Sequence, residues 1–169
     1  DSSLNSFATI STTNFNQFQY GDIITGSYPF SASITRETFD STTSPTGSHL
    51  LALKNTLNYY VPLSPHYAFS SSLGDKEDQD VTLISIPSVF YGSGMHKDSL
   101  KLDFYISGTL VASCEDLYRN GELVQTSGTA YAQGNGSGSV AGVVLYNEGF
   151  VLLTGSWDLT EESFDFGVP

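Results

Sequence analysis

The stretch GSVAGVVLYNEGFVLLTGSWDL, residues 138–159, contains two apolar runs that follow each other almost without interruption. The runs are Val143–Tyr146 and Phe150–Leu153, and the short segment Asn147–Gly149 separates them. Glycine suits the left-handed position of a tight loop, so the pattern predicts an antiparallel hairpin. Strands this apolar are covered on both faces. The hairpin therefore lies in the centre of a sheet between two layers, or has its outer face against another subunit.

Two further patterns predict antiparallel strands upstream of this hairpin. Apolar and polar residues alternate along Leu100–Ile106, which is the period of a half-buried strand. Asn120–Gly121 lies between Asp116–Arg119 and Glu122–Gln125, and both residues of the pair tolerate the positive φ of a type I′ turn. A second hairpin is expected there. The glycine-rich segment Gly128–Ser139 is expected to be a flexible loop between the two hairpins.

The first half of the chain predicts a single short helix after a strand at Ser31–Arg36. Apolar residues recur at the i, i+3, i+7 and i+10 spacing of one helix face, namely Leu50, Leu53, Leu57 and Tyr60. Ser48 or Thr46 is a candidate N-cap, and Pro62 is expected to end the helix.

The first twenty residues are rich in Ser, Thr, Asn and Gln, with aromatic residues between them. Few of them favour a helix, so we expect residues 1–20 to form an extended arm and residues 21–169 to form a single β-rich domain. The aromatic anchors of the arm are Phe7, Phe15, Phe18 and Tyr20. The arm packs either on a neighbouring subunit or on the chain's own domain.

The charge of the chain excludes several classes of partner. The sequence of 169 residues carries 6 Lys and Arg against 18 Asp and Glu, a net charge of −12. Nucleic acid and anionic membranes are therefore poor partners, since both are bound by clustered cations. Charged residues make up only 14% of the chain, so uncharged polar groups must cover the surface. Such a surface is common in extracellular and particle-forming β-proteins.

Cysteine content, hydropathy and the ends of the chain further limit the class of protein. Cys114 is the only cysteine, which excludes an intramolecular disulfide, and its apolar neighbours favour a buried structural thiol over a reactive one. No apolar run is long enough to span a membrane, and no signal-peptide pattern is present. The chain starts at Asp1 without methionine and ends at Pro169, so we expect a processed product or a piece of a longer protein.

Motifs that carry chemistry are scarce. The acidic run Asp75–Asp80 could bind calcium, but it lacks the glycine of an EF-hand loop, and a solvated turn is favoured. The histidines His49, His66 and His96 lie in separate contexts, which favours surface or hydrogen-bonding roles over a metal site. No metal ligand, cofactor site or catalytic residue is therefore predicted.

Carboxylate pairs and aromatic residues leave two alternatives open. Glu115–Asp116 or Glu161–Glu162 could serve a glycosidase, although such pairs arise by chance in an acidic chain. Trp157 and nearby tyrosines could stack on a sugar, although core or interface packing of Trp157 is favoured.

Four longer phrases of the sequence resemble segments of virion structural proteins of tailed bacteriophages, especially marine phages related to the T4-like cyanophages. The phrases are SYPFSASITRETF (27–39), LLALKNTLNYYVPLSPHYAFS (50–70), ISIPSVFYGSGMHKDSLKLDFYISGTL (84–110) and GSVAGVVLYNEGFVLLTGSWDL (138–159). The resemblance implies a non-enzymatic part of a head, neck, tail or baseplate, located in the virion and bound to other virion proteins.

Together these observations predict a mainly β fold, an antiparallel, jelly-roll-like β-sandwich with one short α-helix. The expected function is assembly into a phage particle, with a homo-oligomer among the expected contacts and no cofactor. The alternative is an extracellular carbohydrate-binding β-sandwich module. The residues expected to form the assembly interface are Phe7, Phe15, Phe18, Tyr20, Val143, Leu145, Phe150 and Leu152.

Overall fold

The residues that the computed structural model describes are 8–9, 24–25, 33–39, 50–158 and 163–165. The chain divides into two units, Asp1–Ser33 and Ile34–Pro169. In the first unit, β1 (Ala8–Thr9) pairs in parallel with β2 (Ile24–Thr25). The predicted arm otherwise lies outside the described residues, and its boundary at residue 20 stays a prediction.

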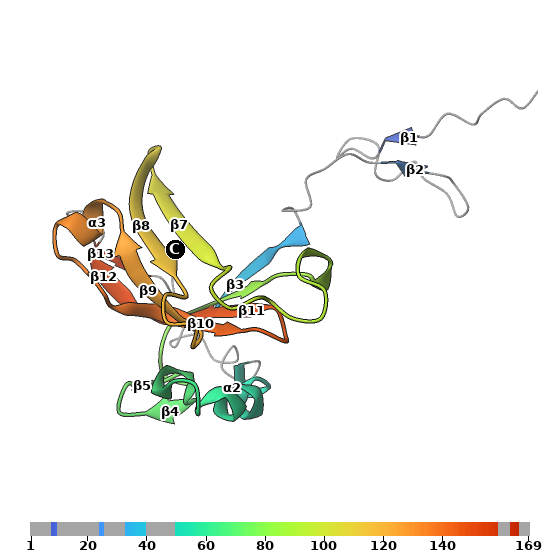
Figure 1. The fold of residues 1–169 in the computed structure, drawn as a ribbon, viewed down its shortest axis with the longest axis horizontal. Coiled ribbons are helices and arrows are strands. Elements are labelled where there is room, and N and C mark those ends of the chain that lie inside the picture. The colour runs from blue at the N-terminus through green and yellow to red at the C-terminus, as the bar shows by residue number, and fades with distance from the viewer. Residues whose placement is uncertain (1–7, 10–23, 26–32, 40–49, 159–162, 166–169) are drawn as a thin grey trace, which may run out of the picture. The chain divides into compact units, whose positions relative to one another are not determined.

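A curled, seven-stranded antiparallel sheet forms the body of the second unit (Figure 1). In spatial order its strands are β3 (Thr35–Phe39), β6 (Val81–Ser85), β11 (Phe150–Leu153), β10 (Val140–Leu145), β9 (Glu122–Ser127), β8 (Thr109–Glu115) and β7 (Lys101–Ile106). Strands β7 to β11 follow one another in the chain as a meander, and β6 pairs with β11 at its end. The predicted mainly β, antiparallel class is confirmed. The curled sheet is compatible with the expected sandwich, which stays a prediction.

Short helices and two small hairpins complete the described elements. They are α2 (Lys54–Tyr60), η3 (Pro65–Tyr67), β4 (Ser70–Ser71), β5 (Gly74–Asp75), η4 (Ser88–Phe90), α3 (Thr129–Ala132), β12 (Ser156–Asp158) and β13 (Ser163–Asp165). In the described part of the chain, no helix is long and apolar enough to cross a membrane.

The hairpin predicted from the opening stretch is confirmed as β10 and β11. Leu145 lies opposite Phe150 and Val143 opposite Leu152, while Gly149 takes a φ of 75° in the connecting loop. Strand β10 is the middle strand of the seven, and all of it except Val140 is buried. Its apolar sequence therefore reflects a central position within the chain's own sheet.

The predicted helix is confirmed in its second half. Its apolar face is buried at Leu57 and Tyr60, and α2 ends just before Pro62. It begins only at Lys54, with Leu53 as its N-cap, while Leu50 is buried upstream of it. The candidate N-caps Ser48 and Thr46 lie outside the described residues. The ring of Tyr60 stacks on that of Tyr67 in η3, with centroids 5.2 Å apart. The hydroxyl of Tyr67 donates to the backbone oxygen of Val144 in β10. The segment from α2 to η3 thus covers one face of the sheet at its centre.

The type I′ turn predicted at Asn120–Gly121 is wrong, although the hairpin exists. Strand β8 ends at Glu115 and β9 begins at Glu122, so the connection is longer than two residues. The positive φ values belong to Arg119 (56°) and Gly121 (88°), not to Asn120. The reason is the side chain of Asp116, which binds the Gly121 N–H and sets a wider loop.

Two other segments differ from the sequence-based expectation. The glycine-rich segment Gly128–Ser139 contains α3, because the buried side chain of Ala130 fixes it to the core. The strand predicted at Ser31–Arg36 begins only at Thr35 and runs to Phe39. Its bounds follow the antiparallel pairing with β6, which extends from Thr35 to Phe39.

Strand β7 shows the predicted alternation only in part. Leu102 and Phe104 are half-buried, but Tyr105 and Ile106 are both exposed. A register shift between Phe104 and Tyr105 in the pairing with β8 interrupts the alternation there.

Candidate functional site

The expected interface residues of the central hairpin are part of the chain's own core. Val143, Leu145 and Leu152 are buried, and Phe150 is half-buried against the core. Val143, Leu145 and Leu152 are thus covered by the chain's own core, whereas Phe150 keeps some exposed surface, and their part in an assembly interface stays a prediction. The arm residues Phe7, Phe15, Phe18 and Tyr20 lie outside the described residues.

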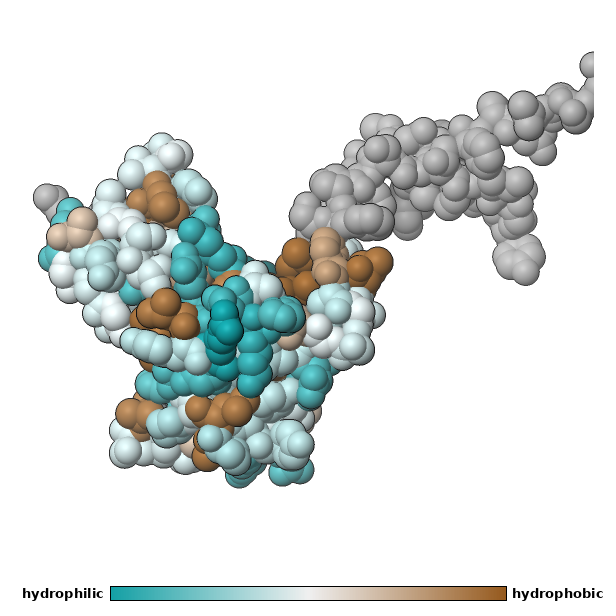
Figure 2. Space-filling model, viewed as in Figure 1, coloured by the Kyte–Doolittle hydropathy of each residue, from teal (hydrophilic) through white to brown (hydrophobic). Residues whose placement is uncertain are grey.

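Exposed apolar side chains occur instead as adjacent pairs in three other places. The pairs are Val89–Phe90 in η4, Tyr105–Ile106 at the end of β7, and Leu117–Tyr118 in the loop between β8 and β9. Figure 2 shows apolar side chains in several separate places on a surface that is otherwise polar. The sequence did not single out these pairs, because two adjacent apolar residues in a loop give no periodic signal.

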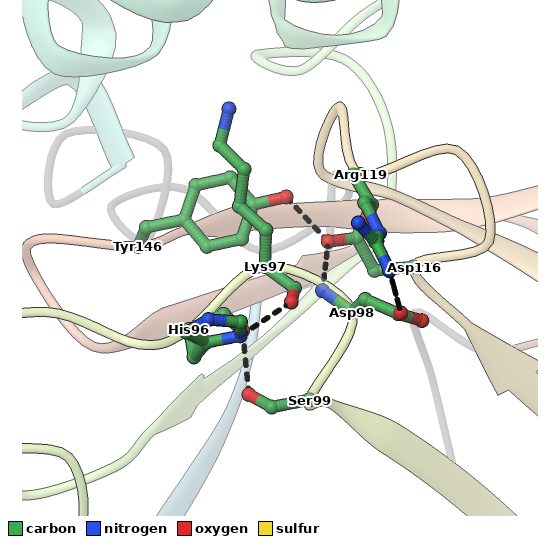
Figure 3. A network of polar contacts seen from close by, with 7 residues as sticks. All are labelled: His96, Lys97, Asp98, Ser99, Asp116, Arg119 and Tyr146. Carbon is green, nitrogen blue, oxygen red and sulfur yellow. Dashed lines mark hydrogen bonds and ion pairs between the residues drawn. The ribbon is translucent and has the colours of Figure 1, made fainter.

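The loop that carries Leu117 and Tyr118 is held by a buried carboxylate (Figure 3). Asp116 is 1% exposed, and its two oxygens accept three hydrogen bonds. The Gly121 N–H donates over 2.9 Å, the Asp98 N–H over 3.1 Å, and the Tyr146 hydroxyl over 2.5 Å. The carboxylate therefore joins its own loop to the loop before β7 and to the end of β10.

Asp98 and Arg119 add a second link between the same two loops. The guanidinium of Arg119 lies 2.9 Å from a carboxylate oxygen of Asp98, and both residues have a positive φ. Left-handed backbone costs energy in residues other than glycine, so surrounding contacts must stabilise it. For Asp98 this contact is the bond from its N–H to the Asp116 carboxylate, and for Arg119 it is the bond from its N–H to the Asp116 backbone oxygen. The two loops are thus locked together.

Tyr146, directly after β10, completes the network. Burial raises the pKa of its hydroxyl, and both the hydrogen bond to Asp116 and the negative charge of that carboxylate raise this pKa further. The ammonium of Lys97 lies 5.6 Å from the centre of the Tyr146 ring. The neutral phenol therefore remains a hydrogen-bond donor to the carboxylate at physiological pH.

The remaining members of the network lie at its edge. The ring of His96 contacts the backbone oxygen of Lys97 through Nδ1 at 2.7 Å, and the Ser99 hydroxyl donates to the backbone oxygen of His96 over 2.5 Å. Both contacts shape the loop before β7. His66 is half-buried in η3, and His49 lies outside the described residues.

A second set of polar contacts fastens the helical segment to the sheet. Ser64 donates to the carboxylate of Glu122, and the Tyr60 hydroxyl donates to that of Glu148 over 2.9 Å. Burial raises the pKa of Tyr67 strongly, and the charge of Asp116 adds to the effect. This set adjoins the Asp116 network through Gly121, where an added Cβ would overlap the Tyr67 hydroxyl.

The acidic run Asp75–Asp80 contains Lys76, whose side chain binds the preceding segment of the chain. Lys76 is buried, and its ammonium donates to the backbone oxygens of His66 and Ala68 over 2.9 and 2.6 Å. Burial lowers the pKa of Lys76 to about 8. Among the described residues, no group of three or more His, Cys, Asp or Glu side chains is arranged to hold a metal ion.

Trp157 and the carboxylate pair are engaged inside the chain. The indole N–H of Trp157 donates to the buried side chain of Gln125 over 2.5 Å, and the ring packs against the core. Glu115 forms an ion pair with Lys101 at 3.2 Å, whereas the adjacent Asp116 is buried in the loop network. These two carboxylates serve different partners. Glu161 and Glu162 lie outside the described residues.

Cys114 is buried in β8, as the sequence predicted. Burial raises the pKa of its thiol to about 12, and the charges of Asp103 and Glu115 also raise it. The thiolate, which is the reactive form of cysteine, is thus disfavoured in the folded protein.

The described polar groups therefore position loops. Contacts of Asp116, Asp98 and Arg119 hold the loop that carries the exposed residues Leu117 and Tyr118. Of these residues, only Asp116 had a signal in the sequence, because an aspartate directly after a strand often binds the backbone of the following turn.

Comparisons of the chain with protein-family models, with curated proteins and with solved structures found no match.

Proposed function

We propose that the protein is a non-enzymatic structural subunit of a phage particle and acts through contacts with other virion proteins, copies of itself included. The observation that carries this proposal is the exposed pair Leu117–Tyr118 on a loop clamped by the buried carboxylate of Asp116. The phage setting comes from the resemblance of the sequence to virion proteins.

A rigid apolar tip suits a contact with another protein. Leu117 is 51% exposed and Tyr118 is 65% exposed, although each has a large apolar surface. Tyrosine is enriched at protein interfaces, where its ring packs and its hydroxyl stays hydrogen-bonded. Because the Asp116 network fixes the loop before binding, little conformational entropy is lost when a partner covers the tip. The pairs in η4 and β7 offer further contacts of this kind.

The protein composition of purified phage particles tests the proposal. In a culture that produces the protein, gradient-purified particles should contain its peptides by mass spectrometry, in a fixed ratio to the other particle proteins. If peptides occur in the lysate but are absent from the particles, the proposal is wrong.

Variants then test the surface that carries the proposal. The double change Leu117→Ser and Tyr118→Ser should lower the amount of protein in particles at least about fivefold, since interface aromatics often dominate binding. Tyr59→Ser is the matched control, because Tyr59 is 78% exposed on α2 and lies outside the three pairs. Equal incorporation of both variants would contradict the role of the clamped loop.

A further inference from the structure

We propose that β7 pairs antiparallel with β7 of a second copy of the chain, about a twofold axis at Leu102, so that two sheets join into one. This inference rests on the proposed assembly function, and it names one contact of that assembly, its partner and its register.

The position of β7 makes such pairing possible. Among the strands of the described residues, the order ends at β3 on one side of the sheet and at β7 on the other, and the partner of β7 is β8. A terminal strand presents backbone N–H and C=O groups along its outer edge, where a further strand can add to the sheet. Lys101, Asp103 and Tyr105 of β7 are exposed.

The charges of β7 select one symmetric register. In a twofold antiparallel pair, residues directly opposite each other share a face of the sheet, and the axis passes through a residue that faces its own copy. An axis at Leu102 places Lys101 of each chain opposite Asp103 of the other. An axis at Lys101 or at Asp103 would place like charges opposite each other instead. Opposite charges across strands stabilise a pair and like charges destabilise it.

Strand β3, the other terminal strand, lacks this self-complementarity. Its charged residues Arg36 and Glu37 are adjacent, so they point to opposite faces of the sheet. No symmetric register can place one opposite the other, and an axis at either residue opposes like charges. The charge pattern therefore favours β7 over β3.

The same register also matches the apolar face of β7. Leu102 would face its own copy, and Leu100, directly before β7, would lie opposite Phe104 of the other chain on each side of the axis. All three side chains are half-buried and pack against the core of their own chain. Pairing would extend this apolar face across the axis. Lys101 already forms an ion pair with Glu115 at 3.2 Å, and Asp103 accepts a hydrogen bond from the Ser113 hydroxyl over 2.6 Å. Their side chains are still 52% and 31% exposed, so each keeps surface that a partner strand can reach.

Cysteine cross-linking tests the register directly. Leu102 lies opposite Cys114 in the pairing of β7 with β8, so the native thiol is first removed by Cys114→Ala. In that background, Leu102→Cys should give a disulfide-linked dimer under mild oxidation, because Cα atoms of directly opposite residues lie about 4.5–5.5 Å apart. Tyr105→Cys is the control, since its two copies would lie about 20 Å apart. Absence of the Leu102→Cys link, or equal linking at both positions, would overturn the register.

Charge reversal tests the same contact without a cysteine. Asp103→Lys alone and Lys101→Asp alone each place like charges across the axis, so each should weaken self-association at least about fivefold in sedimentation equilibrium. An equimolar mixture should form heterodimers, because two lysines of one chain then face two aspartates of the other. Melting curves of each variant verify folding. A mixture no heavier than its components refutes the pairing.

The two proposals fail separately. If the protein is found in particles but neither cross-links nor responds to charge reversal, the β7 contact is wrong and assembly uses other surfaces. If the β7 dimer forms but particles lack the protein, the inference stands and the phage role is wrong.

Discussion

Asp116 shows how a single side chain can set the path of two loops. Its buried carboxylate accepts hydrogen bonds from the backbone of Asp98 and Gly121 and from the hydroxyl of Tyr146. A carboxylate can accept at both oxygens, whereas an amide accepts at one and donates at the other. The network therefore needs an acid at this position, not merely a polar group.

We expect Asp116→Asn to lower the free energy of unfolding by about 2–4 kcal/mol, because a buried donor would lose its acceptor. Urea denaturation followed by circular dichroism measures the change. Glu115→Gln is the control, since its ion pair with Lys101 is partly exposed and should contribute less than about 1 kcal/mol. Similar losses in both variants would show that the burial of Asp116 has no special role.

The buried tyrosines should make the folded protein less stable at alkaline pH. Burial raises the pKa of Tyr67 and of Tyr146 above the ordinary value of 10.0. Above about pH 10 the unfolded chain loses these protons first, so it binds fewer protons than the folded state and stability falls as pH rises. Below pH 10 the contribution is constant.

Denaturation curves of wild type and Tyr146→Phe should diverge above about pH 10, with the shallower fall in the variant. The lowered pKa of Lys76, about 8, acts in the opposite direction in both proteins, so the difference between the two curves isolates the tyrosine. Tyr59→Phe, at an exposed position, should leave the slope unchanged. An identical slope in wild type and Tyr146→Phe would contradict the assignment.

At the scale of elements, residues with a regular period were predictable from sequence. Leu57 and Tyr60 of α2 are buried three residues apart, as the helix pattern predicted, and the β10–β11 hairpin has a loop with Gly149 in the expected left-handed position. The loop after β8 was predicted wrongly, because its shape depends on Asp116 binding residues from distant segments. Local turn preference for Asn120–Gly121 could not include those contacts.

The helix face allows a matched test of packing. Leu57→Ala should destabilise the protein by about 2–5 kcal/mol, because the side chain is fully buried between α2 and the sheet. Tyr59→Ala removes a larger side chain from the same helix, but at an exposed position, and should change stability by less than about 0.5 kcal/mol. Urea midpoints at constant slope measure both; equal losses would mean that α2 does not pack as described.

At the scale of the whole molecule, the order of strands was hidden from the sequence. Successive strands β7 to β11 are neighbours, as the hairpin patterns indicate. Strand β6, however, pairs with β11 rather than with β7, which follows it in the chain. No local pattern in Val81–Ser85 identifies so distant a partner. The candidate surface was missed for a similar reason, since exposure of Leu117 and Tyr118 follows only from the complete fold.

The single thiol reports on opening of the sheet as a whole. Cys114 is completely buried in β8, and burial raises its pKa to about 12. A thiol-specific chromogenic disulfide reagent at pH 8 should therefore label the native protein at least about a thousandfold more slowly than the protein in concentrated urea. Comparable rates would mean that the sheet opens locally around β8.

The pairing of β6 with β11 also affects the order in which the strands can pair during synthesis. During synthesis, β3 and β6 leave the ribosome well before β11 exists, so β3 is the one sheet partner available to β6 in that interval. The meander from β7 to β11 then grows by short connections, which close at little entropic cost. We therefore expect the sheet to assemble from an early pair and a late meander. In that order of events, the pairing of Ile84 with Val151 forms last, because it joins two parts of the sheet that are made at different times.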